Sequence, residues 1–182
     1  MGLLFIRHGD KEYANGKNPP GKPAHDPNLL DNQKELIEKL TIDLVSKYGK
    51  PDKLIVSPFN RTRQTAEIIQ TTIANFYDEF CIVYFDKEVE EFLGFQKPKY
   101  QKADISKFTN IYTHPRLGVE NLEDCKRRII NFYKGIEKEE NIWVITHGIL
   151  MSYLYHHLNG EKRNFSYLEY LEGKKTISYS AS

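Results

Sequence analysis

The chain has 182 residues, a net charge of +1 with histidine neutral, and hydrophobic and charged contents of 40% and 28%. Such a balanced charge gives no overall field that would attract nucleic acid or an anionic membrane surface. No stretch reaches the roughly 20 apolar residues that a membrane-spanning helix needs. These properties predict one globular domain over residues 1–182 that binds neither nucleic acid nor membrane.

The two cysteines, Cys81 and Cys125, are far apart and fall in a predicted strand and a predicted helix. We expect two buried thiols rather than a disulfide, which fits a reducing compartment. No secretory signal pattern is visible at the start of the sequence, so the expected location is cytoplasmic. No Cys/His cluster has the spacing of a zinc site, and we expect no metal and no cofactor.

The first predicted element is a strand, in which four apolar residues, Leu3 to Ile6, run directly into Arg7, His8 and Gly9. An apolar run that stops at charge and glycine is typical of a buried strand ending at a loop. Ligands of open α/β sheets bind just beyond the carboxyl ends of strands. The tripeptide alone leaves two interpretations open: a reactive site, or a strand that meets solvent through two polar residues.

A long loop over residues 11–31 and a helix follow. Asn32 with Glu35 resembles a capping box that opens the helix, and Gly49 and Pro51 end it. The next strand is expected over residues 53–57. The apolar residues of the helix recur at helical spacing, at Leu36, Ile37, Leu40, Leu44 and Val45.

Ser57 and Pro58 predict the N-cap and first turn of a second helix. Its expected buried face consists of Ala66, Ile69, Ile73 and Phe76. A third strand is predicted over residues 81–85. Residues 94–119 show no clear period, and we interpret them as an excursion that covers one end of the sheet.

Asn121 and Asp124 open a further predicted helix, whose buried stripe would be Leu122, Cys125, Ile129, Phe132 and Ile136. A fourth strand, residues 141–146, ends in His147 and Gly148, and a helix then runs to about residue 157. Two short strands are expected in the tail, around residues 165–167 and 176–179. Strands that alternate with helices predict an α/β layered domain.

Three polar clusters follow predicted strands: Arg7-His8-Gly9, the segment 57–61 that ends in Arg61, and His147-Gly148. If the strands lie side by side, these clusters converge at one edge of the sheet. Guanidinium groups bind phosphate bidentately and stay charged at any working pH. Helix starts near residues 57 and 147 would add backbone N–H groups and positive dipole ends. Together these features predict a phosphate receptor.

The chain resembles the histidine phosphatase superfamily, which has the phosphoglycerate-mutase-like fold. The resemblance lies in the opening strand with RHG, in SPFNRTRQTAE after the second strand, in GVENLED before a helix, and in VITHG near the end. These motifs come in the family's order and cover residues 3 to about 150. The resemblance implies a three-layer α/β/α fold around a mostly parallel sheet, no metal, and a phosphohistidine intermediate.

The resemblance assigns the nucleophile to His8 and phosphate binding to Arg7, Arg61 and His147, with His147 also placed among the catalytic residues. A neutral imidazole has a lone pair that can attack phosphorus and split hydrolysis into two steps. The arginines would hold the oxygens on which transferring phosphoryl groups concentrate charge. Lys11 is either a fourth positive group or a solvated loop lysine. Arg63 should point elsewhere, toward the surface.

The family supplies the leaving group's proton from an acid after the third strand, in a segment that here is KEVEEFLGF. The spacing Val89-x-Glu91 favours Glu91, whereas counting back from Gly94 favours Glu90. Both alternatives stay open, and Glu88 fits least well. In an extended segment two adjacent glutamates point to opposite sides, so only one of them can face the phosphate.

Three functions follow from these residues. The first is a metal-independent phosphatase acting on a small-molecule or protein phosphomonoester through phosphohistidine. The second is a phosphoglycerate-type mutase, which is disfavoured because Asn15 lies one position away from the mutases' extra asparagine. The third is a non-catalytic phosphate-binding module. Asp10 and Gln33 also depart from the family pattern, but neither departure removes a phosphate-binding group. The sequence leaves the substrate and the oligomeric state open.

Overall fold

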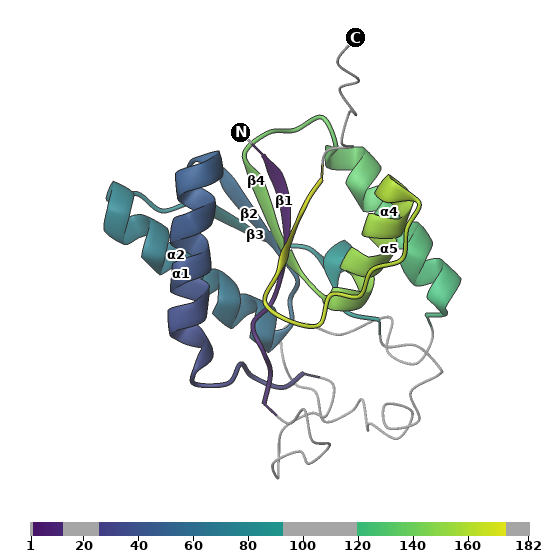
Figure 1. Cartoon of the computed structure of the whole chain (residues 1–182), viewed down its shortest axis with the longest axis horizontal. Helices are drawn as coiled ribbons and strands as arrows, with labels where there is room; N and C mark the ends of the chain where they lie inside the picture. Colours follow the sequence, from purple (N-terminus) through teal and green to yellow (C-terminus); the bar gives the residue numbers. More distant parts are fainter. Residues whose placement is uncertain (1, 13–25, 93–119, 174–182) are drawn as a thin grey trace.

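The computed structural model describes residues 2–12, 26–92 and 120–173. Within these ranges five strands form one sheet with the order β3-β2-β4-β1-β5 (Figure 1). The strands are β1 (Leu3–Arg7), β2 (Lys53–Val56), β3 (Ile82–Phe85), β4 (Ile142–Thr146) and β5 (Tyr170–Glu172). Strands β1 to β4 are parallel to their neighbours, while β5 pairs antiparallel with β1. The sheet is therefore mostly parallel, as predicted.

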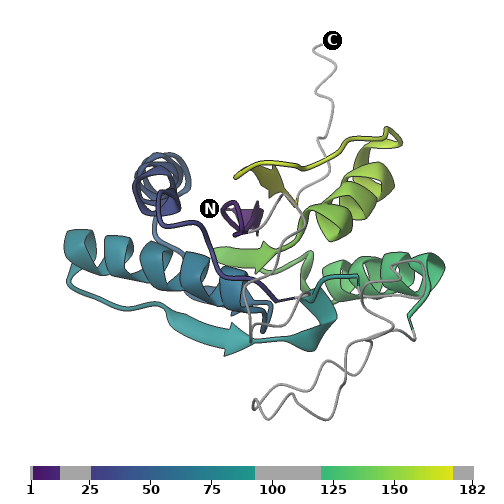
Figure 2. The same ribbon diagram turned by 90° about the horizontal axis from the view of Figure 1, so that it is seen from below.

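Helices cover both faces of this sheet (Figures 1 and 2). On one face lie α1 (Gln33–Tyr48) and α2 (Asn60–Tyr77), and on the other lie α4 (Leu122–Ile136) and α5 (Gly148–Asn159). Side chains alternate along each strand, so β1 sends Leu4 and Ile6 into the α1/α2 core and Leu3 and Phe5 into the α4/α5 core. The three-layer α/β/α prediction is confirmed.

The register of the central strands brings three strand ends together. Strand β1 pairs with β4 from Leu3–Ile142 to Arg7–Thr146, so the two strands end at the same level. Strand β2 ends at Val56, which pairs with Ile145 on the other side of β4. As a result, the polar segments after β1, β2 and β4 lie at one edge of the sheet, the lower edge in Figure 1.

The start of α2 differs from the prediction. The helix begins at Asn60 with Phe59 as N-cap, not at Ser57 and Pro58. The single hydroxyl hydrogen of Thr62 lies between the carbonyl oxygens of Ser57 and Phe59, 2.8 and 2.7 Å from Thr62 Oγ1, in the turn before the helix. The predicted buried face holds for Ala66, Ile69 and Ile73, but Phe76, in the last turn of α2, is 62% exposed.

Other helix ends agree with the sequence to different degrees. Asn121 caps α4, accepting a hydrogen bond from the Asp124 backbone N–H, as predicted. Asn32 occupies the N-cap of α1 but makes no capping bond, because its side-chain oxygen accepts from the side chain of Gln33. Gly49 ends α1 with a φ of 83°, a conformation that favours glycine.

In the tail, the strand is β5 at residues 170–172 rather than at 165–167, because residues 170–172 are the part of the described tail that pairs with β1. The predicted strand at 176–179 and the excursion at 94–119 lie outside the described residues. Cys81 and Cys125 are buried thiols, as predicted. Among the described residues, none of the helices combines the length and apolar character needed to cross a membrane.

Candidate active site

His8 follows β1 and is 3% exposed. Its backbone N–H donates to the carbonyl of Thr146, which extends the β1–β4 ladder by one bond. Its Nδ1 lies 2.6 Å from the carbonyl oxygen of Gly9. A carbonyl only accepts, so Nδ1 carries the proton and donates. The lone pair of Nε2 then faces the interior of the site.

Arg61, in the first turn of α2, lies at the centre of the site and is 1% exposed. Its Nε donates to His8 Nε2 over 3.1 Å, and its Nη2 lies 3.2 Å from His147 Nδ1. The guanidinium group is 4.7 Å from the ring centroid of Phe59. One positive group therefore contacts both imidazoles, which come from two different strands.

His147 follows β4 and is fully buried. Its Nε2 lies 2.7 Å from Ser57 Oγ, at the end of β2. Because a guanidinium group only donates, Nδ1 accepts from Arg61, and the proton on Nε2 is donated to the Ser57 hydroxyl. The rings of His8 and His147 approach edge to face, with centroids 5.1 Å apart.

Burial and nearby positive charge keep both imidazoles neutral. Burial lowers the pKa of His8 well below its usual value of 6.5, and the charges of Arg61, Arg7 and Lys11 lower it further. Burial also lowers the pKa of His147, with contributions from Arg61, His8 and Lys11. Lys11 is half-buried, and its backbone forms an isolated bridge with Leu29. Its charge therefore acts on both histidines.

Arg7, the last residue of β1, reaches the start of α5. Its Nη1 donates to Asp10 Oδ1 over 3.2 Å, and its side chain is 12% exposed. A Cβ at Gly148 would lie 3.4 Å from Arg7 Nε and 2.1 Å from the carbonyl oxygen of Phe165. Only glycine permits this approach, so Gly148 allows the segment around Phe165 to pack against the start of α5.

Glu91 is the glutamate that the structure groups with the two histidines. Its Oε2 lies 3.4 Å from Arg61 Nη2 and 3.6 Å from His147 Nδ1, and its side chain is 12% exposed. Its Oε1 accepts from the backbone N–H of Phe92. Glu90, the alternative from the sequence, is fully buried, and its carbonyl accepts from Arg128 on α4.

Arg63, two residues after Arg61, points away from the site, as predicted. Its guanidinium group lies 5.6 Å from the ring centroid of Phe85 on the edge strand β3. His156 and His157 lie near the end of α5, one half-buried and one exposed. His25 and His114 fall outside the described residues.

Several supporting side chains were not predicted from the sequence. Asp26 Oδ1 accepts from the Asn60 backbone N–H at the start of α2 and lies 3.8 Å from Arg61 Nη1. The Asp26 carboxylate therefore forms an ion pair with Arg61 and bonds to the residue before it. Gln33 Oε1 accepts from the Asp10 N–H, and Thr65 Oγ1 accepts from the Gly9 N–H. These contacts join segments far apart in sequence; the only local signal was the departure of Gln33 from the family's glycine.

The ligand atoms of His8, Glu91 and His147 all lie within 4.8 Å of one another, a grouping that could hold a metal ion. Sequence spacing gave no sign of it, because the three residues come from separate segments. The hydrogens of Arg61 point at both imidazole nitrogens and lie close to the Glu91 carboxylate. A positive charge at this centre opposes a cation and attracts an anion. The site therefore fits a phosphate better than a metal.

Comparisons with known proteins identify the family of this chain. The model of the histidine phosphatase superfamily (branch 1) matches residues 3–176, and the chain belongs to this family. The predicted resemblance is confirmed. A comparison with curated proteins found no match.

Solved structures with the same fold include three phosphatases. The protein histidine phosphatase SixA complexed with tungstate is 16% identical over 94% of this chain and 86% of its own, with a TM-score of 0.58. Mycobacterial glucosyl-3-phosphoglycerate phosphatase is 16% identical over 93% and 88%, with a TM-score of 0.63. Phosphoserine phosphatase from Entamoeba histolytica, in complex with 3-phosphoglyceric acid, is 16% identical over 92% and 87%, with a TM-score of 0.60. These likenesses show the fold.

Proposed function

We propose that this protein is a metal-independent phosphatase that hydrolyses a phosphomonoester through a phosphohistidine on His8. The observation that carries the proposal is the neutral, buried His8, whose Nε2 lone pair faces the Arg61 guanidinium group. A nucleophile and a phosphate-binding group thus meet at one point. Family membership supports the same reaction.

In the first step a phosphate ester displaces the hydrogen bonds of Arg61 to the imidazoles. We call Arg7, His8, Arg61 and His147 the phosphate cluster. Nε2 of His8 attacks phosphorus, the P–N bond forms, and the bond from phosphorus to the ester oxygen breaks. The ring becomes positively charged, and the Gly9 carbonyl, which accepts from Nδ1–H, stabilises that charge.

The leaving oxygen needs a proton, and Glu91 is placed to supply it beside Arg61 and His147. In this proposal Glu91 gives its proton to the leaving oxygen and is left as a carboxylate. In the second step water attacks the phosphohistidine, and the Glu91 carboxylate accepts the proton. The P–N bond breaks, which releases inorganic phosphate and restores His8.

The Ser57 hydroxyl can bond to either neutral tautomer of His147, with the proton on Nε2 or on Nδ1. A hydroxyl can donate or accept. In the ligand-free site it accepts from His147 Nε2, since Nδ1 accepts from Arg61. When phosphate takes Arg61, Ser57 can donate to Nε2 instead, and the proton moved to Nδ1 then points at a phosphoryl oxygen. His147 thus binds phosphate while remaining neutral.

The test is release of nitrophenolate from p-nitrophenyl phosphate, with and without EDTA. Activity should survive chelation, and vanadate or tungstate, which resemble the transition state or the bound phosphate, should inhibit. Complete loss with EDTA and recovery with a divalent ion would contradict the proposal and would assign the His8, Glu91 and His147 grouping to a metal.

The substrate is to be found by a panel of phosphorylated metabolites and phosphopeptides. The structural neighbours are named for a phosphoprotein, a glucosyl phosphoglycerate and phosphoserine, so their names point to no single substrate. Phosphate release without isomerised product from phosphoglycerate would separate a phosphatase from a mutase. The panel therefore tests both the ester class and the reaction type.

A further inference from the structure

The segment that carries Glu91 is held by bonds to its backbone. We call residues 88–92 the acid segment. Arg128 Nη1 donates to the carbonyl oxygens of Glu88 and Glu90, over 2.6 and 3.0 Å. Thr146 Oγ1, at the end of β4, donates to the carbonyl of Val89 over 2.7 Å. Three successive carbonyls are therefore each fixed by a buried side chain.

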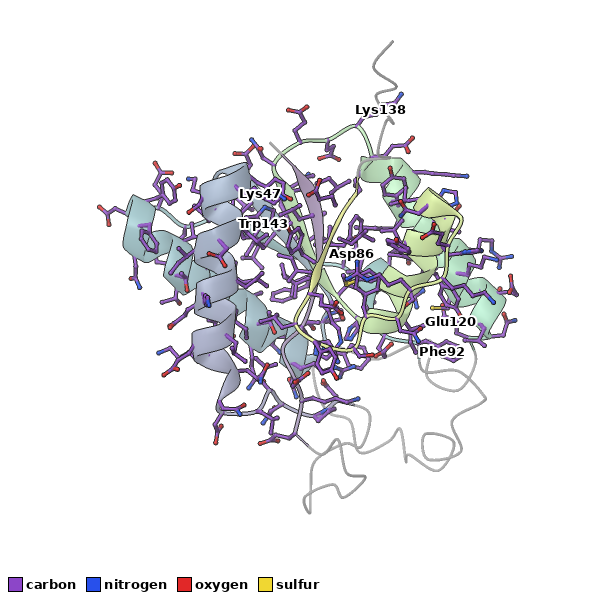
Figure 3. The ribbon with its side chains drawn as sticks, in the orientation of Figure 1. Lys47, Asp86, Phe92, Glu120, Lys138 and Trp143 are labelled. Carbon is purple, nitrogen blue, oxygen red and sulfur yellow. The ribbon has the colours of Figure 1, made fainter. Side chains whose placement is uncertain are left out.

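Arg128 is itself locked in place by Glu120. Its Nε and Nη2 donate to the two oxygens of the Glu120 carboxylate, over 2.7 and 2.8 Å. Both side chains are 5% exposed. Figure 3 labels Glu120 and Phe92, which lie toward the same end of α4. This fork-to-fork pair is rigid and specific in direction, and lysine cannot reproduce it.

The carboxylate of Glu91 has weaker restraints of its own. Its distances to Arg61 and His147 are 3.4 and 3.6 Å, at or beyond the limit of a good hydrogen bond. Its closer contact is with the N–H of Phe92, the next residue. The position of this side chain therefore depends on where the backbone of the acid segment lies.

We propose that Arg128, held by Glu120, is a positioning residue that places Glu91 for proton transfer. Arg128 acts through the carbonyl of Glu90, which belongs to the peptide bond that joins Glu90 to Glu91. The inference rests on the proposed role of Glu91 as the acid. A displacement of about 1 Å can cost a hundredfold in rate, so loss of this support affects the protonation step.

The test compares two esters with different needs for an acid. Nitrophenolate leaves with little protonation, whereas an alkoxide from glycerol 2-phosphate needs a proton. Arg128→Lys keeps the positive charge beside Glu120 but loses the pair of parallel hydrogen bonds to its carboxylate. It should lower kcat/KM for glycerol 2-phosphate about tenfold or more and for p-nitrophenyl phosphate less than about threefold. Arg127→Lys is the matched control, since Arg127 is exposed, pairs with Asp124, and should change neither value.

Combining Arg128→Lys with Glu91→Gln separates positioning from other roles. If Arg128 acts through Glu91, the double variant should lose no more activity on the alkyl ester than Glu91→Gln alone. Equal losses on the two esters, or additive losses in the double variant, would overturn the inference and leave Arg128 a purely structural residue.

Glu120→Gln provides a second route if Arg128→Lys fails to fold. This substitution keeps one oxygen acceptor for Arg128 and removes the second. The kcat/KM for the alkyl ester should therefore fall selectively again, but by a smaller factor than in Arg128→Lys. Unchanged selectivity in a folded Glu120→Gln protein would count against the inference. If Glu91→Gln itself is unselective, the acid assignment fails; if only Arg128→Lys and Glu120→Gln are unselective, the positioning role alone fails.

Discussion

The phosphate cluster and the acid segment are built in opposite ways. In the cluster, side chains project from the ends of β1 and β4 and from the start of α2, and Arg61 contacts both imidazoles directly. In the acid segment, Arg128 and Thr146 hold the backbone, and Glu91 is placed as a consequence. Damage to the cluster should thus reduce turnover of every ester. Damage to the acid segment should reduce turnover only where the leaving group needs a proton.

The largest effect is expected at the centre of the cluster. His8→Ala removes the atom that forms the P–N bond, so turnover of both aryl and alkyl phosphates should be abolished. Wild-type protein quenched during turnover should carry an acid-labile, alkali-stable phosphoryl group, and the variant should carry none. Circular dichroism checks that the variant is folded. Turnover comparable to wild type in His8→Ala would rule out the mechanism.

The next largest effect is expected at Arg61. Arg61→Ala removes the charge that meets the developing negative charge on the phosphoryl oxygens. It should lower kcat and kcat/KM together by about a hundredfold or more, on both esters. Arg63→Ala is the control, because Arg63 lies beside Phe85 rather than in the site. Similar losses in the two variants would contradict the central role given to Arg61.

Glu91→Gln should sharpen the contrast between the two regions. Hydrolysis of glycerol 2-phosphate should fall by about a hundredfold, while that of p-nitrophenyl phosphate changes much less. Glu90→Gln is the matched control, since Glu90 is the neighbouring residue and is not grouped with the histidines. If Glu90→Gln gives the selective loss instead, the acid is Glu90. If neither variant does, Asp10 and Lys11 are the next positions to test.

The smallest expected effect is a pH dependence of stability from the cluster. Folded His8 and His147 have lowered pKa values, so below pH 6.5 the unfolded chain takes up protons that the folded protein does not. The contribution of the two histidines to the free energy of unfolding is therefore fully present above this pH. It declines as pH falls toward the folded pKa values, by at most about 1.4 kcal/mol per pH unit for each histidine.

Urea unfolding at pH 7, 6 and 5 measures this dependence. His8→Ala should show a shallower decline than wild type, because one of the two shifted groups is gone. An identical decline in wild type and His8→Ala would show that burial of His8 does not contribute to the pH dependence.

Local chemistry in the sequence was sufficient to predict the layered fold and the placement of the cluster. Apolar strands that stop at Arg7 and His147 identify the edge at which the cluster lies, because carboxyl ends of parallel strands meet at one side of a sheet. The same reasoning failed at the start of α2, where Ser57 and Pro58 resemble a helix start. The Ser57 hydroxyl instead bonds to His147, a partner ninety residues away, and the helix begins three residues later.

The sequence by itself determined that Arg7, His8, Arg61 and His147 lie at one edge of the sheet, since this follows from short motifs and hydrophobic pattern. Their roles in catalysis stay predictions. Only the tertiary structure decided that Glu91 rather than Glu90 lies beside the histidines, that Asp26 supports Arg61, and that Arg128 fixes the acid segment. The physical reason is that these contacts join segments far apart along the chain. Their distances depend on how α2, α4 and β4 pack together, which no local pattern records.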